Sequence, residues 1–127
     1  MAVSATSDLG DAEEITLSLP ARPQFARVAR LTVTGLASRV GFTYDEIEDL
    51  RIAVGEVCSL LLPGPEGRLT FRCRVEAGAV AVRATREPVG RPIEAGDLSR
   101  QILLAVVDEL ELDAEAGSVR VAKRHRG

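Results

Sequence analysis

The sequence predicts an α+β domain, a two-layer α/β sandwich in which a mixed, mostly antiparallel sheet carries three helices on one face. Three observations lead to this fold class. The chain has 127 residues, enough for one hydrophobic core and too few for two. Its hydrophobic fraction is 46% with few aromatics, so Val, Leu, Ile and Ala must fill the core. The order of expected elements is strand, helix, helix, hairpin, loop, helix, hairpin, without internal repeats.

The ends of the chain differ in composition from its middle. Residues 1–13 are small, polar and acidic without apolar periodicity, which predicts a disordered segment. Residues 124–127 continue a short basic run and are expected to form a flexible tail. The folded domain should therefore span residues 14–123, beginning with a strand over 14–19, where apolar and polar residues alternate.

The first helix is expected over residues 24–40, and Gly41 should end it in a left-handed conformation. A polar stripe runs along one side of this helix, with one apolar residue at its edge. A solvated helix face is the ordinary meaning of such a stripe, and a binding surface is the alternative. Its members are Arg27, Arg30, Thr34 and Ser38, with Leu31 at the edge.

The second helix, residues 43–62, has the best-defined boundaries in the sequence. Thr43 and Glu46 form a capping box at its start, and Pro63 follows its end. Glu56 lies in one row with Ile52 and Leu60, which are four residues before and after it. This row is either a solvated carboxylate among single exposed apolar residues or the lining of a pocket or partner surface.

The remaining elements follow from alternation and turn residues. A hairpin is expected over residues 68–76 and 79–85, followed by a loop over 86–96. Asp97 should cap a third helix over residues 98–110. A second hairpin, residues 111–114 and 118–123, should turn at Gly117.

Composition excludes several classes of function. The net charge of −3 with interspersed signs argues against nucleic acid as a partner. No secretory signal pattern and no membrane-spanning apolar stretch are visible, which favours a cytoplasmic protein without a membrane partner. Cys58 and Cys73 are expected in the core, and two Cys with one His at unrelated positions predict no metal site.

Two stretches resemble a known family. Residues 30–39 (RLTVTGLASR) and 43–54 (TYDEIEDLRIAV) are close to the pattern of anti-sigma factor serine kinases of the RsbW and SpoIIAB type, and Phe25 to Val28 match the first helix of SpoIIAB. Weaker similarity extends from Ile15 to Lys123. The resemblance implies the Bergerat fold, also called the histidine kinase-like (GHKL) ATPase fold.

The resemblance also implies an ATP site, of which several parts differ here. The family carries a general-base Glu and, four residues later, an Asn that binds Mg²⁺. Glu56 matches the base, but Leu60 replaces the Asn and offers no oxygen to Mg²⁺. The family's adenine-binding Asp aligns with Arg86, which donates where an acceptor is needed. Glu87 would restore the acceptor if the register shifted by one residue.

The phosphate-binding segment is altered as well. The family's Gly-rich loop aligns with residues 96–100, where only Gly96 remains and Asp97 would repel a phosphate. Arg100 would offset this repulsion in part. We therefore expect weak or absent ATP binding, no cofactor, and a remnant role for Glu56, as in a pseudo-kinase. ATP with Mg²⁺ is the alternative.

In the family, the first helix and neighbouring loops bind the sigma factor, and a STAS-domain anti-anti-sigma factor competes for an overlapping surface. The match at residues 25–28 places Arg27 on that surface. The leading hypothesis is therefore a homodimeric anti-sigma-type regulator of stress-response transcription that acts by binding an alternative sigma factor, a STAS protein or both. A working serine-protein kinase and a scaffold for an unrelated partner are the alternatives.

Overall fold

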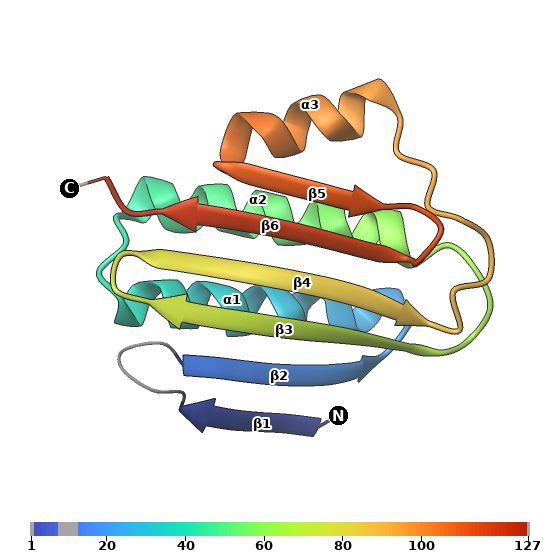
Figure 1. Cartoon of the computed structure of the whole chain (residues 1–127), viewed down its shortest axis with the longest axis horizontal. Helices are drawn as coiled ribbons and strands as arrows, with labels where there is room; N and C mark the ends of the chain where they lie inside the picture. The colour runs from blue at the N-terminus through green and yellow to red at the C-terminus, as the bar shows by residue number, and fades with distance from the viewer. Residues whose placement is uncertain (1, 8–12, 127) are drawn as a thin grey trace.

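A computed structural model describes residues 2–7 and 13–126 of the chain. They form one six-stranded sheet in the order β1-β2-β3-β4-β6-β5, and every pairing between these strands is antiparallel. The helices cover one face, with α3 beside α2 at the β5 edge (Figure 1). The predicted two-layer α+β fold is confirmed. The elements are β1 (Ala2–Ser7), β2 (Glu13–Pro20), the 3-10 turn η1 (Pro23–Phe25), α1 (Ala26–Arg39), α2 (Tyr44–Leu61), β3 (Arg68–Glu76), β4 (Ala79–Glu87), α3 (Asp97–Val106), β5 (Glu109–Asp113) and β6 (Ser118–Arg124).

Helix α2 begins at the predicted capping box. The Thr43 hydroxyl accepts a hydrogen bond from Glu46 N at 3.2 Å, and the Glu46 carboxylate accepts one from Thr43 N at 2.8 Å. Two of the N–H groups that a helix leaves free at its start are thereby satisfied. Helix α1 ends as predicted, because Gly41 adopts a φ of 83°, which side chains other than glycine rarely allow.

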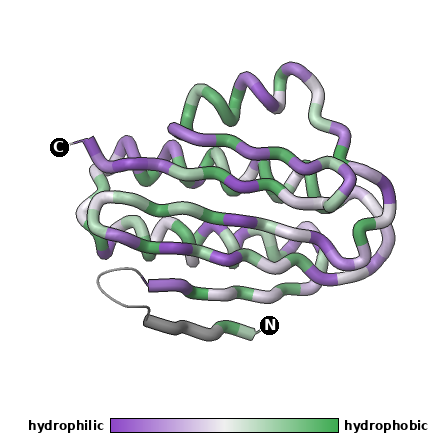
Figure 2. Tube along the Cα trace, viewed as in Figure 1, coloured by the Kyte–Doolittle hydropathy of each residue, from purple (hydrophilic) through white to green (hydrophobic). Residues whose placement is uncertain are grey.

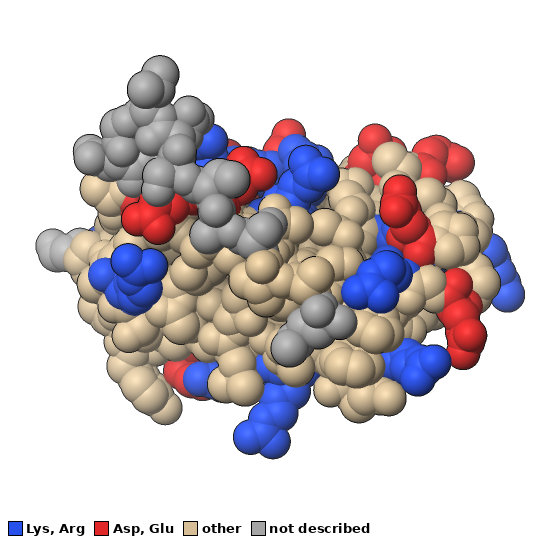
Figure 3. Space-filling view, turned by 90° about the horizontal axis from the view of Figure 1, so that it is seen from below, with Lys and Arg blue, Asp and Glu red and all other residues tan. Residues whose placement is uncertain are grey.

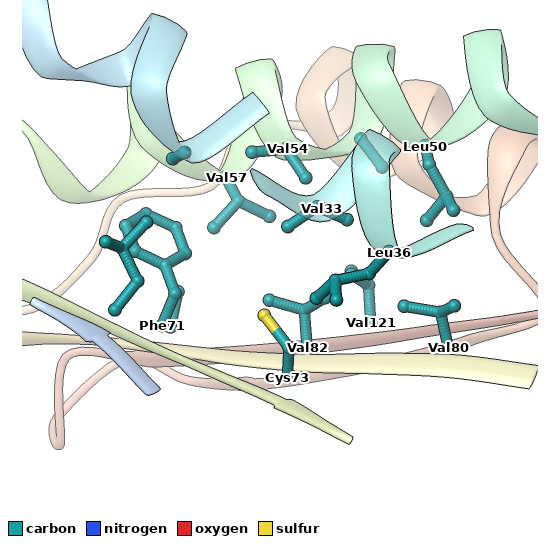
Figure 4. Close-up of a cluster of buried hydrophobic side chains, with 14 of the residues drawn as sticks. Val33, Leu36, Leu50, Val54, Val57, Phe71, Cys73, Val80, Val82 and Val121 are labelled. Atoms are coloured by element: carbon teal, nitrogen blue, oxygen red, sulfur yellow. The ribbon is translucent and has the colours of Figure 1, made fainter. Parts of the chain in front are cut away.

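The core lies between the helices and the sheet. Apolar and polar residues alternate along the strands (Figure 2), and the apolar ones point towards α1 and α2. Val54 and Val57 of α2 face Phe71, Val82 and other sheet residues (Figure 4). Cys58 and Cys73 are buried in this core, as the sequence predicts.

The N-terminal expectation was wrong for six residues. Instead of a disordered segment over residues 1–13, Ala2–Ser7 forms strand β1, and Val3 lies opposite Leu17 of β2. Pairing with β1 satisfies the outer backbone groups of β2, which would otherwise be an open edge. Residues 8–12 of that segment lie outside the described residues.

The C-terminal tail, expected to be flexible over residues 124–127, is held by specific bonds. Arg124 belongs to β6, and its N–H donates to Asp108 Oδ2 at 2.8 Å. His125 and Arg126 both bind Glu46 at the start of α2. Gly127 lies outside the described residues.

Helix α3 is shorter than predicted and is capped differently. It ends at Val106, and Gly96, not Asp97, occupies the N-cap position without a side-chain bond. The backbone of Val107 is already extended, with φ −126° and ψ 160°. The pairing of Glu109 and Leu110 with β6 takes these residues from the helix into β5.

Candidate functional site

A cavity of about 260 Å³ opens where helix α2 ends, next to the end of β4 and the loop that follows it. This is the region in which the family resemblance places the nucleotide site. Its wall combines apolar side chains with two arginines and one carboxylate. Its lining includes Leu60, Gly64, Arg86, Arg91, Ile93 and Glu94.

Arg86 is the central residue of this wall. It continues the inward-facing alternation of Val80, Val82 and Ala84 along β4, and only 3% of it is exposed. Its Nη1 donates to the carbonyl oxygens of Leu61 at 2.6 Å and Leu62 at 3.3 Å. Its Nη2 donates to the carbonyl of Pro65. The guanidinium thus binds two carbonyl groups at the end of α2 and one in the loop that follows it.

This arrangement suits a cation. The last carbonyls of a helix have no partner within the helix and carry partial negative charge, so a buried guanidinium there is bound by charge-assisted hydrogen bonds. Gly64 allows the close approach, because a Cβ at this position would lie 3.2 Å from Arg86 Nε. Within the described part of the chain, Nε itself has no hydrogen-bond partner.

The structure brings together two of the residues predicted for nucleotide chemistry and separates the others. Leu60 and Arg86 both line the cavity, whereas Glu56 is half-buried one turn earlier on α2 and is not part of the wall. Glu87 is exposed and follows Arg86 in the strand, so it faces the opposite side of the sheet. The acceptor that a shifted register would supply is therefore directed away from the cavity.

The phosphate-loop residues also lie outside the wall. Gly96 and Arg100 are both exposed at the start of α3 and do not line the cavity. Arg91 and Glu94, which the sequence analysis did not single out, take that place. They lie in a loop without periodicity, so no sequence pattern indicated where their side chains would lie.

The second candidate surface, on α1, is only partly as predicted. Arg27, Leu31 and Ser38 are exposed. Arg30 is half-buried and lies over α2, where a Cβ at Gly55 would be 3.8 Å from its Nη1. Thr34 is buried, with 7% exposed, and its hydroxyl donates to the Arg30 carbonyl at 2.8 Å. The prediction that Thr34 belongs to an exposed stripe was wrong, because α2 covers that side of α1.

A third cluster, missed by sequence reasoning, joins the start of α2 to the end of β6. His125 Nδ1 lies 2.8 Å from Glu46 Oε1, and the Arg126 N–H donates to Glu46 Oε2 at 2.7 Å. The His125 ring also stacks on Phe42, with ring centroids 6.1 Å apart. The hydrogen bond from His125, with those from the Thr43 and Arg126 backbone, lowers the pKa of Glu46 to about 2.

The two thiols are chemically quiet. Burial raises the pKa of Cys58 to about 11 and that of Cys73 to about 12. The thiolate is the reactive form of cysteine, so neither residue is a candidate nucleophile. Among the residues that the structure describes, no helix is both long and apolar enough to span a membrane.

No protein-family model matches the chain. Comparison with individual proteins does give relatives. Serine-protein kinase RsbW of Halalkalibacterium halodurans is 30% identical over 129 aligned positions, which cover 84% of this chain and 80% of that protein. The chain belongs to the RsbW family. RsbW of Bacillus pumilus matches at the same identity over 81% of this chain and 80% of its own length.

Similarity within the RsbW family is concentrated in one stretch. RsbW of Bacillus subtilis is 53% identical over 49 residues, which span 39% of this chain and only 31% of that protein. The crystal structure of the RsbU and RsbW domains of Rv1364c from Mycobacterium tuberculosis covers 89% of this chain with a TM-score of 0.65 and 17% identity. This chain covers 32% of that longer chain, and at this identity the match supports the fold alone.

Proposed function

We propose that this member of the RsbW family is an anti-sigma-type regulator that acts by protein binding, with ATP binding and kinase activity weak or lost. Its partners are an alternative sigma factor, a STAS-domain anti-anti-sigma factor or both, and it acts as a homodimer. The partners and the dimer come from the family resemblance. The loss of nucleotide chemistry comes from the residues around the cavity.

The position of Arg86 is the observation that carries the proposal. An adenine amino group needs an acceptor, and the Arg86 guanidinium offers only donors, of which Nη1 and Nη2 already bind backbone carbonyls. Placing a ligand donor against it would leave a buried polar group unsatisfied, at about 1–3 kcal/mol. Leu60 offers no oxygen to Mg²⁺ from the same wall. These residues do not fit Mg-ATP.

The surface of α1 supports the partner-binding half of the proposal. Arg27 and Leu31 are exposed one turn apart on the helix that the family uses for the sigma factor. Arginine is enriched in protein interfaces relative to the rest of the surface, and Leu31 adds apolar area beside it. Ser38 extends the same surface by two turns, whereas Thr34 is buried and Arg30 lies mainly against α2.

Isothermal titration with Mg-ATP tests the nucleotide half. We expect no measurable heat of binding up to millimolar nucleotide, with Bacillus subtilis RsbW as the positive control in the same buffer. Micromolar binding would contradict the proposal and favour the working-kinase alternative. Incubation with radiolabelled ATP and co-purified host proteins would then show whether a serine is phosphorylated.

Affinity capture from the native host tests the partner half. The Arg27→Glu variant should lose the partner that the wild-type chain captures, and its thermal stability should stay unchanged because Arg27 is exposed. Arg91→Glu is the matched control, since it makes the same charge change on an exposed residue far along the chain. Retention of the partner by Arg27→Glu would show that the α1 surface is the wrong one.

A further inference from the structure

Three arginines lie in one row across the centre of the sheet. Arg72 of β3 is directly opposite Arg83 of β4, and Arg83 is directly opposite Arg120 of β6. Their neighbours along each strand are core residues, so all three side chains lie on the face without helices. We call these three residues the arginine row. Figure 1 views the molecule from this face.

Such a row is unfavourable for folding on its own. Directly opposite residues in an antiparallel pair have Cβ atoms about 5 Å apart, and like charges there destabilise the sheet. Compensation comes from β5 alone. Glu111 lies 3.2 Å from Arg120 and 3.8 Å from Arg83. Among the described residues, no carboxylate forms an ion pair with Arg72.

The surroundings of the row leave it accessible. The residues beside it towards one end of the strands include Ala81 and Ala122, which lie opposite each other. Towards the other end lie Thr70, Thr85 and Ser118, which also form a row. The first of these lines also holds Arg74, opposite Ala81, and Glu109, opposite Ala122, whereas the second holds small side chains. A partner can therefore approach the row from the side of the small residues, where Arg72 and Arg83 are exposed and Arg120 is half-buried.

We propose that the arginine row binds an acidic segment of a protein partner. The three side chains start from Cβ atoms about 5 Å apart, and arginine pairs with carboxylates in a bidentate geometry. Arg83 and Arg120 share the carboxylate of Glu111, so Arg72 is the member of the row most open to a carboxylate of a partner. Carboxylates are interspersed along this face, Glu111 among them, so it offers no continuous basic surface to an extended polyphosphate. Acidic and basic side chains are also interspersed on the side of the molecule seen in Figure 3. This surface is separate from α1, so the proposal does not depend on the function proposed above.

The test uses the intact chain and a fluorescein-labelled decaglutamate peptide, followed by fluorescence anisotropy at low salt. The wild-type protein should bind the peptide, and Arg72→Glu should weaken binding by about tenfold or more. Arg22→Glu makes the same charge change on an exposed arginine outside the sheet and outside the cavity wall, so it is the matched control and should bind like the wild type. Binding should weaken steeply as salt increases, because the contacts are ionic and exposed.

A second measurement separates binding from a structural role. Arg72→Glu replaces a repulsion with an ion pair to Arg83, so its melting temperature should rise by about 2–4 °C while peptide binding falls. A lower melting temperature would mean that Arg72 serves the fold, and the proposal would fail. It would also fail if Arg22→Glu lost binding equally or if a decathymidylate bound more tightly than the peptide. A change in the sedimentation coefficient of Arg72→Glu would assign the face to a second copy of the chain instead.

Discussion

The two ends of helix α2 are stabilised by opposite charges in different ways. At the start, Glu46 accepts hydrogen bonds from Thr43, three residues away, and from the distant His125 and Arg126. At the end, Arg86, some 25 residues away, donates to the carbonyls of Leu61 and Leu62. Both charges complement the helix dipole. Some of the contacts at the start come from residues nearby in the sequence. The charged contacts at the end come from a distant strand, and this end borders a cavity.

This difference separates a helix start that is closed by its own and distant residues from a helix end that borders an open space. The capping box at the start of α2 serves the helix itself. The end of α2 borders the region that would hold a nucleotide, and there a cation from β4 satisfies the helix carbonyls. Arg86 therefore has a structural role at this helix end, as a donor to the carbonyls of Leu61 and Leu62.

The largest effect should come from removing the cation at the end of α2. Arg86→Met keeps the aliphatic volume but leaves three carbonyls without their charged donor, so we expect a loss of about 3 kcal/mol in the free energy of unfolding. Urea denaturation measures it. Arg91→Met, an exposed residue of the same cavity wall, should change stability by less than about 0.5 kcal/mol. Equal losses in both variants would remove the special role of Arg86.

A smaller effect is expected at the start of α2. Glu46→Gln keeps one acceptor oxygen but removes the charge that His125 and the helix dipole favour, so stability at pH 7 should fall by about 1 kcal/mol. Glu48→Gln, on the same helix with an exposed ion pair to Arg51, should be close to neutral. The informative result is that Glu46→Gln loses less stability than Arg86→Met. If Glu46→Gln were the more damaging change, the charge at the start of α2 would contribute more to stability than the charge at its end.

The pH dependence of Glu46 sharpens the same contrast. Its pKa is lowered from 4.5 to about 2 in the folded state, chiefly by His125. The stability it contributes is therefore present above about pH 4.5 and is lost as the pH falls towards 2. Wild-type protein should lose more stability than Glu46→Gln across this window, so the difference between them should shrink. Thermal unfolding followed by circular dichroism at pH 5, 4, 3 and 2 measures the convergence, and parallel curves would contradict it.

The smallest effect concerns the thiols. Cys58 lies one turn before the end of α2, and burial raises its pKa to about 11. Both cysteines should react slowly with Ellman's reagent at pH 8. In Arg86→Met the last turn of α2 should open more often, so Cys58 should react several-fold faster while Cys73 in β3 stays protected. Equal acceleration at both thiols would indicate global destabilisation rather than local opening.

Most of the fold follows from local patterns in the sequence. The capping box at Thr43, the Gly41 helix end and the alternation in β3 and β4 each depend on residues close together, and the structure confirms them. Strand β1 was not predicted, since its polar, small residues form a strand only by pairing with β2. The end of α3 was placed too late because pairing with β6 draws Glu109 into β5.

The candidate site was less accessible to sequence reasoning. The alternation of Val80, Val82 and Ala84 continues to Arg86 and would have placed it facing inward, but the expected strand stopped at Thr85. No sequence pattern announces that its partners are backbone carbonyls of α2, because every residue carries such a group. The burial of Thr34 and the pairing of His125 with Glu46 depend in the same way on how distant elements pack.

The contact between His125 and Glu46 spans 79 positions of the chain. A polypeptide still under synthesis cannot make it until that histidine has left the ribosome tunnel, although α2 itself emerged long before. Until then, the first turn of α2 is held by the local bonds between Thr43 and Glu46 alone. Deleting the residues after Lys123 would leave the finished protein without the bonds from His125 and Arg126 to Glu46.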